Sequence, residues 1–477
     1  MKTKIFCLLI AIMMLFGCVG CMPEDSDYDP LEGVDFNVPL SYTGEITVWI
    51  QAYDYEKTMM NTFVDKFNKR YPNIKVNVEP ITPAQYQSTL QKASNLDGMP
   101  DIFWVSPQNI GIYNDWDVIM PLNAVIEKDG SFSTDNIVNE SLSCFQQDGE
   151  LWGIPRDFNQ VVLYYNKDMF DAAGVAYPSA TEAMSLEQFE KTMKDLKEGL
   201  AKSTKTNSYG ETYKDCVVSS WDVCMTWDSM IWPVLKSYGA EVIREDGTYQ
   251  IDGKPLLDSE EALNAFEWCM DITQKGYIEA KQATHQDSLA FKLERSPMYS
   301  HMRCNLVDLI TPSGQYKGIS NLGIAPFPNL GSQDNYYIGS GATGYGLYKR
   351  SKDIVAAWLF LKSIVSEETQ EELSKTGVVT PANKAVLEDP NAEWRKFTDT
   401  HVGEGYNEPY IYRKEEAYTH INQFLQYINF EYQNSVYFDL STLYCQITDL
   451  CKDRASAAEY LTMYANRIAS YCALKEN

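Results

Sequence analysis

The sequence predicts an α/β protein of two domains, on the strength of three observations. The chain has 477 residues, more than a single hydrophobic core usually serves, so two domains are expected. Hydrophobic residues make up 44% of it, which is the share of an ordinary globular protein. Between residues 45 and 105, strand-like and helix-like stretches alternate, and such alternation predicts a parallel sheet with crossover helices.

The first domain opens with three strand-like stretches separated by two helices. Residues 45–50 (EITVWI) and 74–79 (IKVNVE) alternate apolar and polar side chains, as half-buried strands do. Residues 100–105 (PDIFWV) predict a third strand, and a second helix is expected near 85–94. The first helix ends before a proline and carries one apolar stripe, made of Met60, Phe63, Val64, Phe67 and Tyr71.

Two later helices carry a capping signal at their start. Ser185 and Gln188 form a capping box for a helix that runs to about residue 200. Asp258 and Glu261 stand in the same arrangement before the next strongly patterned helix. Both signals fit helices that cover a sheet in the second half of the chain.

The remaining elements are short strands and amphipathic helices. Residues 296–302 (SPMYSHM) and 321–328 (NLGIAPFP) are expected to include strands. A helix pair is expected over 351–373, and the chain from 392 onward is mostly helical and rich in tyrosine. One face of the pair carries Ile354, Trp358, Leu361 and Val365.

The N-terminus predicts an export signal followed by a lipid anchor. Lys2 and Lys4 precede an apolar run over 5–16, which has the length of a signal sequence and is too short to span a membrane. A small residue then precedes Cys18, as in bacterial lipoprotein signals, and Cys21 is the rival acylation site. Residues 1–18 are therefore interpreted as signal peptide and anchor cysteine, and the acidic stretch 19–43 as a flexible tether.

Charge and motif content exclude several classes of protein. The net charge of −26 argues against nucleic acid as a partner. The eight cysteines beyond Cys21 form no CxxC pair and the four histidines are scattered, so neither a metal nor another cofactor is expected. Disulfide pairing stays open. The GSGATG stretch at 339–344 matches a dinucleotide motif, but a strand-like run follows it instead of a helix.

The order of motifs resembles one family over residues 44–468. It is carried by FNKRYPNIKVNVE, GMPDIFWVSPQNI, LWGIPRDFNQVVLYYNKDMFDAAGV, LGIAPFP, YYIGSGATG and SKDIVAAWLFLKSIVSEETQ. The chain resembles the extracellular solute-binding proteins of family 1, the maltose-binding-protein-like group that serves ABC importers. The resemblance implies a two-lobed periplasmic-binding-protein-like fold of type II, in which each lobe is a sheet with flanking helices and hinge strands cross between them. Lobe one would take 44–157 and 337–380, and lobe two 158–336 and 381–477.

The function implied by the resemblance is capture of a carbohydrate, expected to be an oligosaccharide, in a cleft between the lobes. The protein would close on this ligand and deliver it to ABC importer permease subunits. It would be a monomer on the extracytoplasmic face, held at the cell membrane by its lipid anchor, and would not be an enzyme. The alternatives are a surface-anchored carbohydrate-active enzyme, or the same fold binding a non-sugar solute or serving a membrane sensor.

The resemblance also implies which residues bind the ligand. The family's usual aromatic residue is missing near 303, where this chain reads SPMYSHMRCN. Three readings from the residues themselves stay open: Arg156 and Asp157 as a structural ion pair, Arg156 as a selector of acidic ligands, and Trp104 and Trp232 as core residues. The implied ligand-binding residues are Gln51, Tyr53, Asp54, Trp104, Ser106, Gln108, Arg156, Asp157, Asn159, Trp227, Asp228, Trp232, Arg303, Asn305 and Tyr437.

Overall fold

The structure is a computed structural model that describes residues 29–96, 98–279, 288–331, 335–412, 418–419, 428 and 433–474. Residues up to Val34 form one unit, and Asp35 onward form a second, compact unit. The expected anchor cysteines, Cys18 and Cys21, lie outside the described residues. Within the described part of the chain, no helix combines the length and apolar character that crossing a membrane requires.

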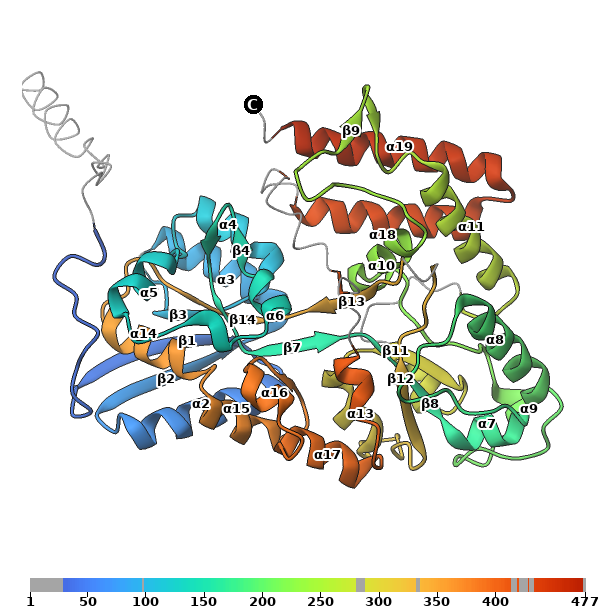
Figure 1. The fold of residues 1–477 in the computed structure, drawn as a ribbon, viewed down its shortest axis with the longest axis horizontal. Helices are drawn as coiled ribbons and strands as arrows, with labels where there is room; N and C mark the ends of the chain where they lie inside the picture. Colours follow the sequence, from blue (N-terminus) through green and yellow to red (C-terminus); the bar gives the residue numbers. More distant parts are fainter. Residues whose placement is uncertain are drawn as a thin grey trace, which may run out of the picture. The chain divides into compact units, whose positions relative to one another are not determined.

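Lobe one is built on a five-stranded sheet with the order β2-β1-β3-β14-β6 (Figure 1). β1 pairs in parallel with both β2 and β3, as the alternation of strands and helices predicts. β14 returns from a distant part of the chain and pairs antiparallel with β3 and β6. The strands are β1 (Gly44–Gln51), β2 (Ile74–Ile81), β3 (Ile102–Val105), β6 (Ile154–Pro155) and β14 (Gly344–Leu347); the helices are α2 (Asp54–Arg70), α3 (Pro83–Asn95), α4 (Ile110–Asp115), α5 (Asn123–Asp129), α6 (Asn139–Ser143), α14 (Ile354–Ser363) and α15 (Glu367–Ser374).

The first helix of lobe one buries a face that the sequence predicted only in part. Met60, Phe63 and Phe67 are buried, as expected from their helical spacing. Glu56 is buried on the same helix and is only 1% exposed. A charged group at that depth is costly unless it is paired, and its partner belongs to the candidate functional site described below.

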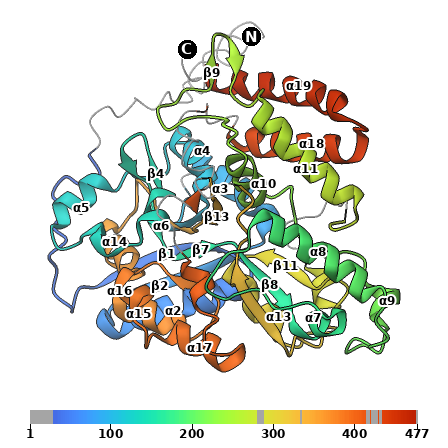
Figure 2. The same ribbon diagram turned by 45° about the vertical axis from the view of Figure 1, so that its right-hand side comes forward.

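Lobe two is built on a three-stranded antiparallel sheet with the order β11-β8-β12 and an adjoining layer of helices. α11, α18 and α19 lie side by side in this layer (Figure 2). The capping box of Ser185 and Gln188 is confirmed, whereas α11 is capped by Ser259 and not by Asp258. The elements are β8 (Val162–Asn166), β11 (Met298–His301), β12 (Leu322–Pro326), α7 (Lys167–Ala173), α8 (Leu186–Leu200), α10 (Asp228–Ser237), α11 (Glu260–Gln274), α13 (Leu306–Ile310), α18 (Gln433–Leu450) and α19 (Arg454–Ala473).

A separate four-stranded sheet, β15-β7-β13-β16, carries the strands expected to cross between the lobes (Figure 1). We call these the hinge strands. β7 is the central one and pairs antiparallel with β13 and β15. No helix opens after the GSGATG stretch, since β14 follows directly, so the nucleotide-loop reading is excluded. The hinge strands are β7 (Asp157–Gln160), β13 (Ile338–Gly341), β15 (Thr380–Pro381) and β16 (Tyr418–Thr419).

The glycines of this stretch allow close packing of backbones. A Cβ atom at Gly339 would lie 1.8 Å from the carbonyl oxygen of Ser229, so α10 packs directly on β13. A Cβ atom at Gly344 would lie 2.2 Å from the carbonyl oxygen of Ile154. Both positions therefore require glycine.

The end of the segment expected to be a flexible tether packs on lobe one. Phe36 is only 4% exposed and meets Trp358 edge to face, with 6.4 Å between ring centroids. The hydroxyl of Tyr42 donates to Asp353 at 3.0 Å. Residues 36 and 42 thus belong to the folded body, because an aromatic ring gains more from burial than its ordering costs.

Candidate functional site

The centre of the candidate site is β7, whose four residues alternate between two faces. Phe158 points into a hydrophobic core and Gln160 donates to the carbonyl oxygen of Pro409. Asp157 and Asn159 occupy the other face. The hinge strands therefore place two polar side chains on one side and anchor themselves with the other.

Asn159 has unused hydrogen-bonding capacity. Its side chain is 7% exposed and its Oδ1 atom accepts no hydrogen bond within the described residues. Gly341 lies directly opposite on β13, and a Cβ atom there would meet only the Cε atom of Met302, at 3.9 Å. A buried amide oxygen without a protein partner costs roughly 1–3 kcal/mol unless a water molecule or a ligand supplies the hydrogen bond.

Arg156 stands beside this face in a buried ion-pair network. It is 4% exposed, pairs with Glu56 of α2 and donates its Nε to Asp157 at 3.3 Å. Burial opposes the charge on Arg156, but the carboxylates of Glu56 and Asp157 outweigh that effect and hold its pKa well above the usual value. Of the readings left open by the sequence, the structure shows the ion pair.

The same network ties three elements together. The hydroxyl of Tyr345 on β14 donates to Glu56 at 2.5 Å. The other carboxylate oxygen of Asp157 accepts from the backbone amide of Thr343 at 3.0 Å. The start of α2, the start of β7 and the link between β13 and β14 are therefore fixed to one another by charged hydrogen bonds.

An aromatic stack lies at the end of β11. The rings of Trp227 and His301 are parallel to within 18°, with centroids 4.7 Å apart. His301 in turn stacks on Tyr299 at 5.7 Å, and the amide nitrogen of Asn305 lies 2.6 Å from its Nδ1 atom. Trp227 and Asn305 are among the ligand contacts implied by the resemblance, whereas His301 is not; its only signal in the sequence is its place at the end of a predicted strand.

Asp228 follows Trp227 and opens α10. Burial raises the pKa of its carboxyl group to about 6, although the backbone amides of Ser229 and of Asp228 itself pull in the opposite direction. Since α10 packs against β13 at Ser229, this carboxyl group belongs to the helix end that meets the hinge strands.

Cys304 connects the stack with the hinge strands. Its Sγ atom lies 4.0 Å from Nδ1 of His301. Burial, and next the charge of Asp157, raise the pKa of its thiol to about 11, while Arg156 opposes the shift. The thiol is therefore close enough to Asp157 and Arg156 for their charges to affect it.

The first turn of α2 reaches the same place from lobe one. Burial raises the pKa of Tyr55; the charge of Arg156 opposes this, and those of Glu56 and Cys304 add to it. Tyr53 stacks on Tyr55 with centroids 5.2 Å apart. Gln51 ends β1 just before these rings and is half-buried, whereas Asp54 is exposed and pairs with Lys57 at 3.1 Å.

The residues that follow β3 form a further group. Trp104 is half-buried and meets Tyr86 edge to face at 5.7 Å, so it is partly a core residue. Ser106 and Gln108 are half-buried around a short 3-10 helix, η1 (Pro107–Asn109), that contacts α18. Tyr437 lies within the bounds of α18, but its side chain falls outside the described residues.

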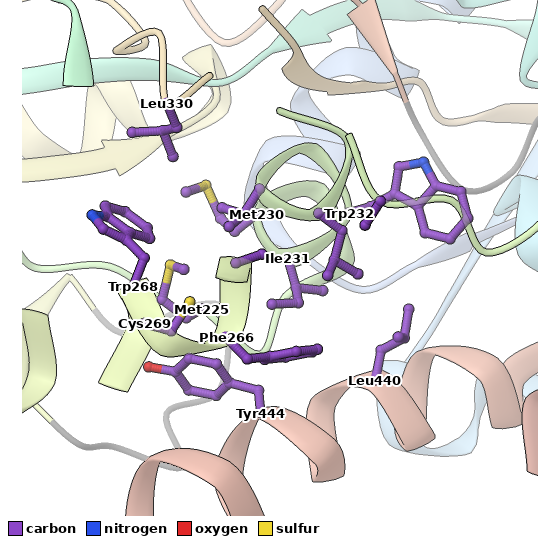
Figure 3. Close-up of a cluster of buried hydrophobic side chains, with 14 of the residues drawn as sticks. Met225, Met230, Ile231, Trp232, Phe266, Trp268, Cys269, Leu330, Leu440 and Tyr444 are labelled. Atoms are coloured by element: carbon purple, nitrogen blue, oxygen red, sulfur yellow. The ribbon is translucent and has the colours of Figure 1, made fainter. Parts of the chain in front are cut away.

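Two residues expected at the site lie in cores instead. Trp232 is 1% exposed and belongs to the apolar cluster of lobe two, where its ring lies on the side of α10 away from Trp268 (Figure 3). Arg303 is 0% exposed, donates to Thr398 at 2.9 Å and to the carbonyl oxygen of Trp394 at 2.8 Å, and its guanidinium lies over the Tyr410 ring. In this conformation neither side chain offers a surface to a ligand.

A cavity of about 910 Å³ lies on lobe one, and its lining includes residues of α2, α14 and α15 and also Asn383, just beyond β15. Its two half-buried lysines are already neutralised: Lys66 pairs with Glu368 at 3.2 Å, and Lys362 pairs with Asp129 at 2.8 Å. Neither lysine therefore has an unpaired charge to offer a ligand in this cavity. Within the described ranges, no group of three or more His, Cys, Asp or Glu side chains is placed to hold a metal ion.

The sequence and the fold are similar to those of known solute-binding proteins. An arabinooligosaccharide-binding protein of Bacillus subtilis is 26% identical over 181 residues, which is 37% of this chain and 38% of that protein's length. An ABC substrate-binding protein of Listeria monocytogenes, solved with cycloalternan, has a TM-score of 0.68 at 19% identity and covers 90% of this chain and 100% of its own.

UgpB of Mycobacterium tuberculosis, solved with glycerophosphocholine, has a TM-score of 0.68 at 15% identity and covers 91% of this chain and 100% of its own. The two-lobed α/β fold implied by the sequence is thus confirmed. The model of the bacterial extracellular solute-binding proteins matches residues 62–399. With that match over most of its length, the chain belongs to the bacterial extracellular solute-binding protein family.

Proposed function

We propose that this protein captures an oligosaccharide at the hinge strands and delivers it to an ABC importer. The observation that carries the proposal is the buried Asn159 amide, whose oxygen has no partner and which faces Gly341. A sugar hydroxyl donates to such an oxygen, and the half-buried Trp227 ring would take the C–H face of a sugar on the side that does not stack on His301. The relative that binds arabinooligosaccharides and the fold shared with a cycloalternan complex support the ligand class.

Capture would proceed by closure of the lobes around the ligand. The candidate residues come from α2 and β3 in lobe one, from β7 and β13 in the hinge, and from β11 and α10 in lobe two. A ligand that touches all three groups stabilises the conformation in which they converge. The importer would recognise that conformation, and the ligand would be released unchanged, because the protein acts as a receptor and not as an enzyme.

The proposal includes a lipid anchor on the extracytoplasmic face. Cys18 would be acylated after removal of the signal sequence, with Cys21 as the alternative, and the protein would act as a monomer. Mass spectrometry of the membrane-extracted protein would locate the acylated N-terminal cysteine. A soluble mature protein with an unmodified N-terminus would contradict the anchor.

Thermal unfolding of the lipid-free protein, starting at about residue 25, tests the ligand class. A ligand that binds only the folded state stabilises it by about 2.7 kcal/mol at a hundredfold excess over Kd. A rise in Tm with one sugar class, with that sugar recovered intact, is the expected result. A rise with glycerophosphodiesters or peptides alone would favour a non-sugar solute, and breakdown of the sugar would indicate an enzyme.

A further inference from the structure

We propose that the ligand is an uncharged carbohydrate, and that uronic acids and sugar phosphates are excluded from the site. This inference rests on the proposed function and narrows it. It follows from the state of the two arginines that the sequence places near the hinge strands, and from the charges that surround them.

Arg156 cannot recognise an anionic ligand because its charge is already neutralised. Its guanidinium is 4% exposed and contacts two carboxylates, those of Glu56 and Asp157. An anionic ligand would have to displace one of them, which would leave that carboxylate buried and unpaired. Breaking a buried pair in this way is strongly unfavourable.

Arg303 cannot recognise an anion either, because it cannot be reached. It is 0% exposed, and two of its nitrogens donate to Thr398 and to the Trp394 carbonyl oxygen. The rings of Trp394 and Tyr410 lie within 5.3 Å and 4.7 Å of its guanidinium carbon. Burial lowers its pKa, which Tyr410 and Tyr164 partly offset.

The charges around the hinge strands are unfavourable for an anion. Among the described residues near the hinge strands, the carboxyl groups of Glu56, Asp157 and Asp228 stand against the guanidinium of Arg156. Burial raises the pKa of the half-buried Asp228 to about 6 and the backbone amides oppose this shift, so at neutral pH its carboxyl group adds a negative charge. Charges repel more strongly in such an environment than in water, so a uronate carboxylate entering here would lose solvation and gain repulsion.

Apart from Asp228, several described groups that remain to meet a ligand are neutral. The Oδ1 atom of Asn159 is an acceptor without a partner, and Asn305, Ser106 and Gln108 are half-buried amides or hydroxyls. The ring of Trp227, which stacks on His301, adds a flat apolar surface. Neutral amides next to a flat ring suit the hydroxyls and C–H faces of a sugar.

The test uses two pairs of oligosaccharides, each with a neutral and a charged member on a similar sugar backbone. One pair is a neutral galactose trimer and the galacturonic acid trimer; the other is the chitin trimer and its cationic, deacetylated form. Affinities would be measured by calorimetry at about 0.02 and 0.5 M salt, since screening changes charged contacts and leaves neutral ones nearly unaffected. The neutral member of the pair that binds is expected to do so at least about tenfold more tightly than its charged partner, with less than about a twofold change with salt.

A second measurement uses Asp228→Asn, which removes one negative charge and keeps the shape of the side chain. The acidic trimer should then bind this variant at least about fivefold more tightly relative to the neutral trimer than it binds the unaltered protein. Tighter binding of the acidic or the cationic trimer by the unaltered protein would overturn the inference and leave the carbohydrate function standing. Binding of glycerophosphocholine with no response to any sugar would overturn the proposed function itself, and the inference with it.

Discussion

Glu56 and Arg156, a hundred residues apart in the chain, form a buried ion pair at the start of the hinge strands. The first belongs to the opening turn of α2 in lobe one, and the second immediately precedes β7. Asp157 completes the group from the other side. The pair holds the start of β7 against the beginning of α2, next to Tyr53 and Tyr55. It therefore acts on the site by positioning these two elements.

Replacing Glu56 by Gln should destabilise the protein strongly. Arg156 would keep one carboxylate partner in place of two in a buried environment, and breaking a buried pair costs about 3–5 kcal/mol. Chemical denaturation of the ligand-free protein measures this loss. The control is Asp54→Asn on the same helix turn, where the carboxylate is exposed and the loss should stay below about 0.5 kcal/mol. Equal losses of stability for the two changes would mean that the buried pair contributes no more than an exposed carboxylate.

Replacing Asn159 by Ala should weaken ligand binding and spare the fold. The change removes a buried amide oxygen that has no partner, so the free energy of unfolding of the ligand-free protein should stay unchanged or rise by up to about 1 kcal/mol. The lost contact should lower affinity by about 1–2 kcal/mol, close to tenfold in Kd. A marked fall in Tm with unchanged affinity would show that Asn159 serves the fold alone.

Two glycines of β13 should respond differently to Ala. At Gly339 a Cβ atom would overlap the Ser229 carbonyl oxygen at 1.8 Å, so this variant should lose several kcal/mol or fail to fold. At Gly341 the nearest atom is Cε of Met302 at 3.9 Å, so the variant should fold normally. Its new methyl group would stand opposite Asn159 and should reduce ligand affinity. A Gly341→Ala protein with full affinity would place the ligand elsewhere.

Replacing the two tryptophans near the start of α10 should have different effects on stability and on ligand affinity. Trp232 is buried in the apolar cluster of lobe two, so Trp232→Ala should cost about 3–5 kcal/mol of stability. Trp227 is half-buried and stacks on His301, so Trp227→Ala should cost less stability and more ligand affinity. Denaturation and calorimetry on both variants would compare these losses; the reverse order would assign the ligand contact to Trp232.

Asp228 predicts a pH dependence whose sign is fixed by its raised pKa. Between pH 3.8, the ordinary value, and about 6, the folded protein holds a proton that the unfolded chain has released. Stability therefore falls as the pH rises through this window, by up to about 3 kcal/mol above it. Asp228→Asn cannot ionise, so its Tm advantage over the unaltered protein should be larger near pH 7.5 than near pH 4.5. An advantage independent of pH would contradict a buried, ionising carboxyl group.

The strand-helix alternation, the capping box of Ser185 and the family motifs were enough to predict the fold, because they are local signals whose spacing survives folding. They also predict ligand contacts at Asn159 and Trp227, and these stay predictions until binding is measured. The tether was expected to extend to residue 43, yet Phe36 is buried, since one aromatic ring in a polar segment is a weak signal. Likewise, Ser259 and Asp258 are adjacent capping residues, and sequence alone does not choose between them.

The class of fold, the family and the elements that reach the hinge strands follow from local patterns along the chain. Which side chains remain available there depends on contacts that form only in the folded protein. Glu56 looks like any acidic residue in a first helical turn until Arg156 is brought to it, and Trp232 and Arg303 look like ligand contacts until the cores close over them. Most buried polar groups form hydrogen bonds, and their partners can lie far apart in the chain. Whether the Oδ1 atom of Asn159 is left without a partner is therefore decided only when the packing is complete.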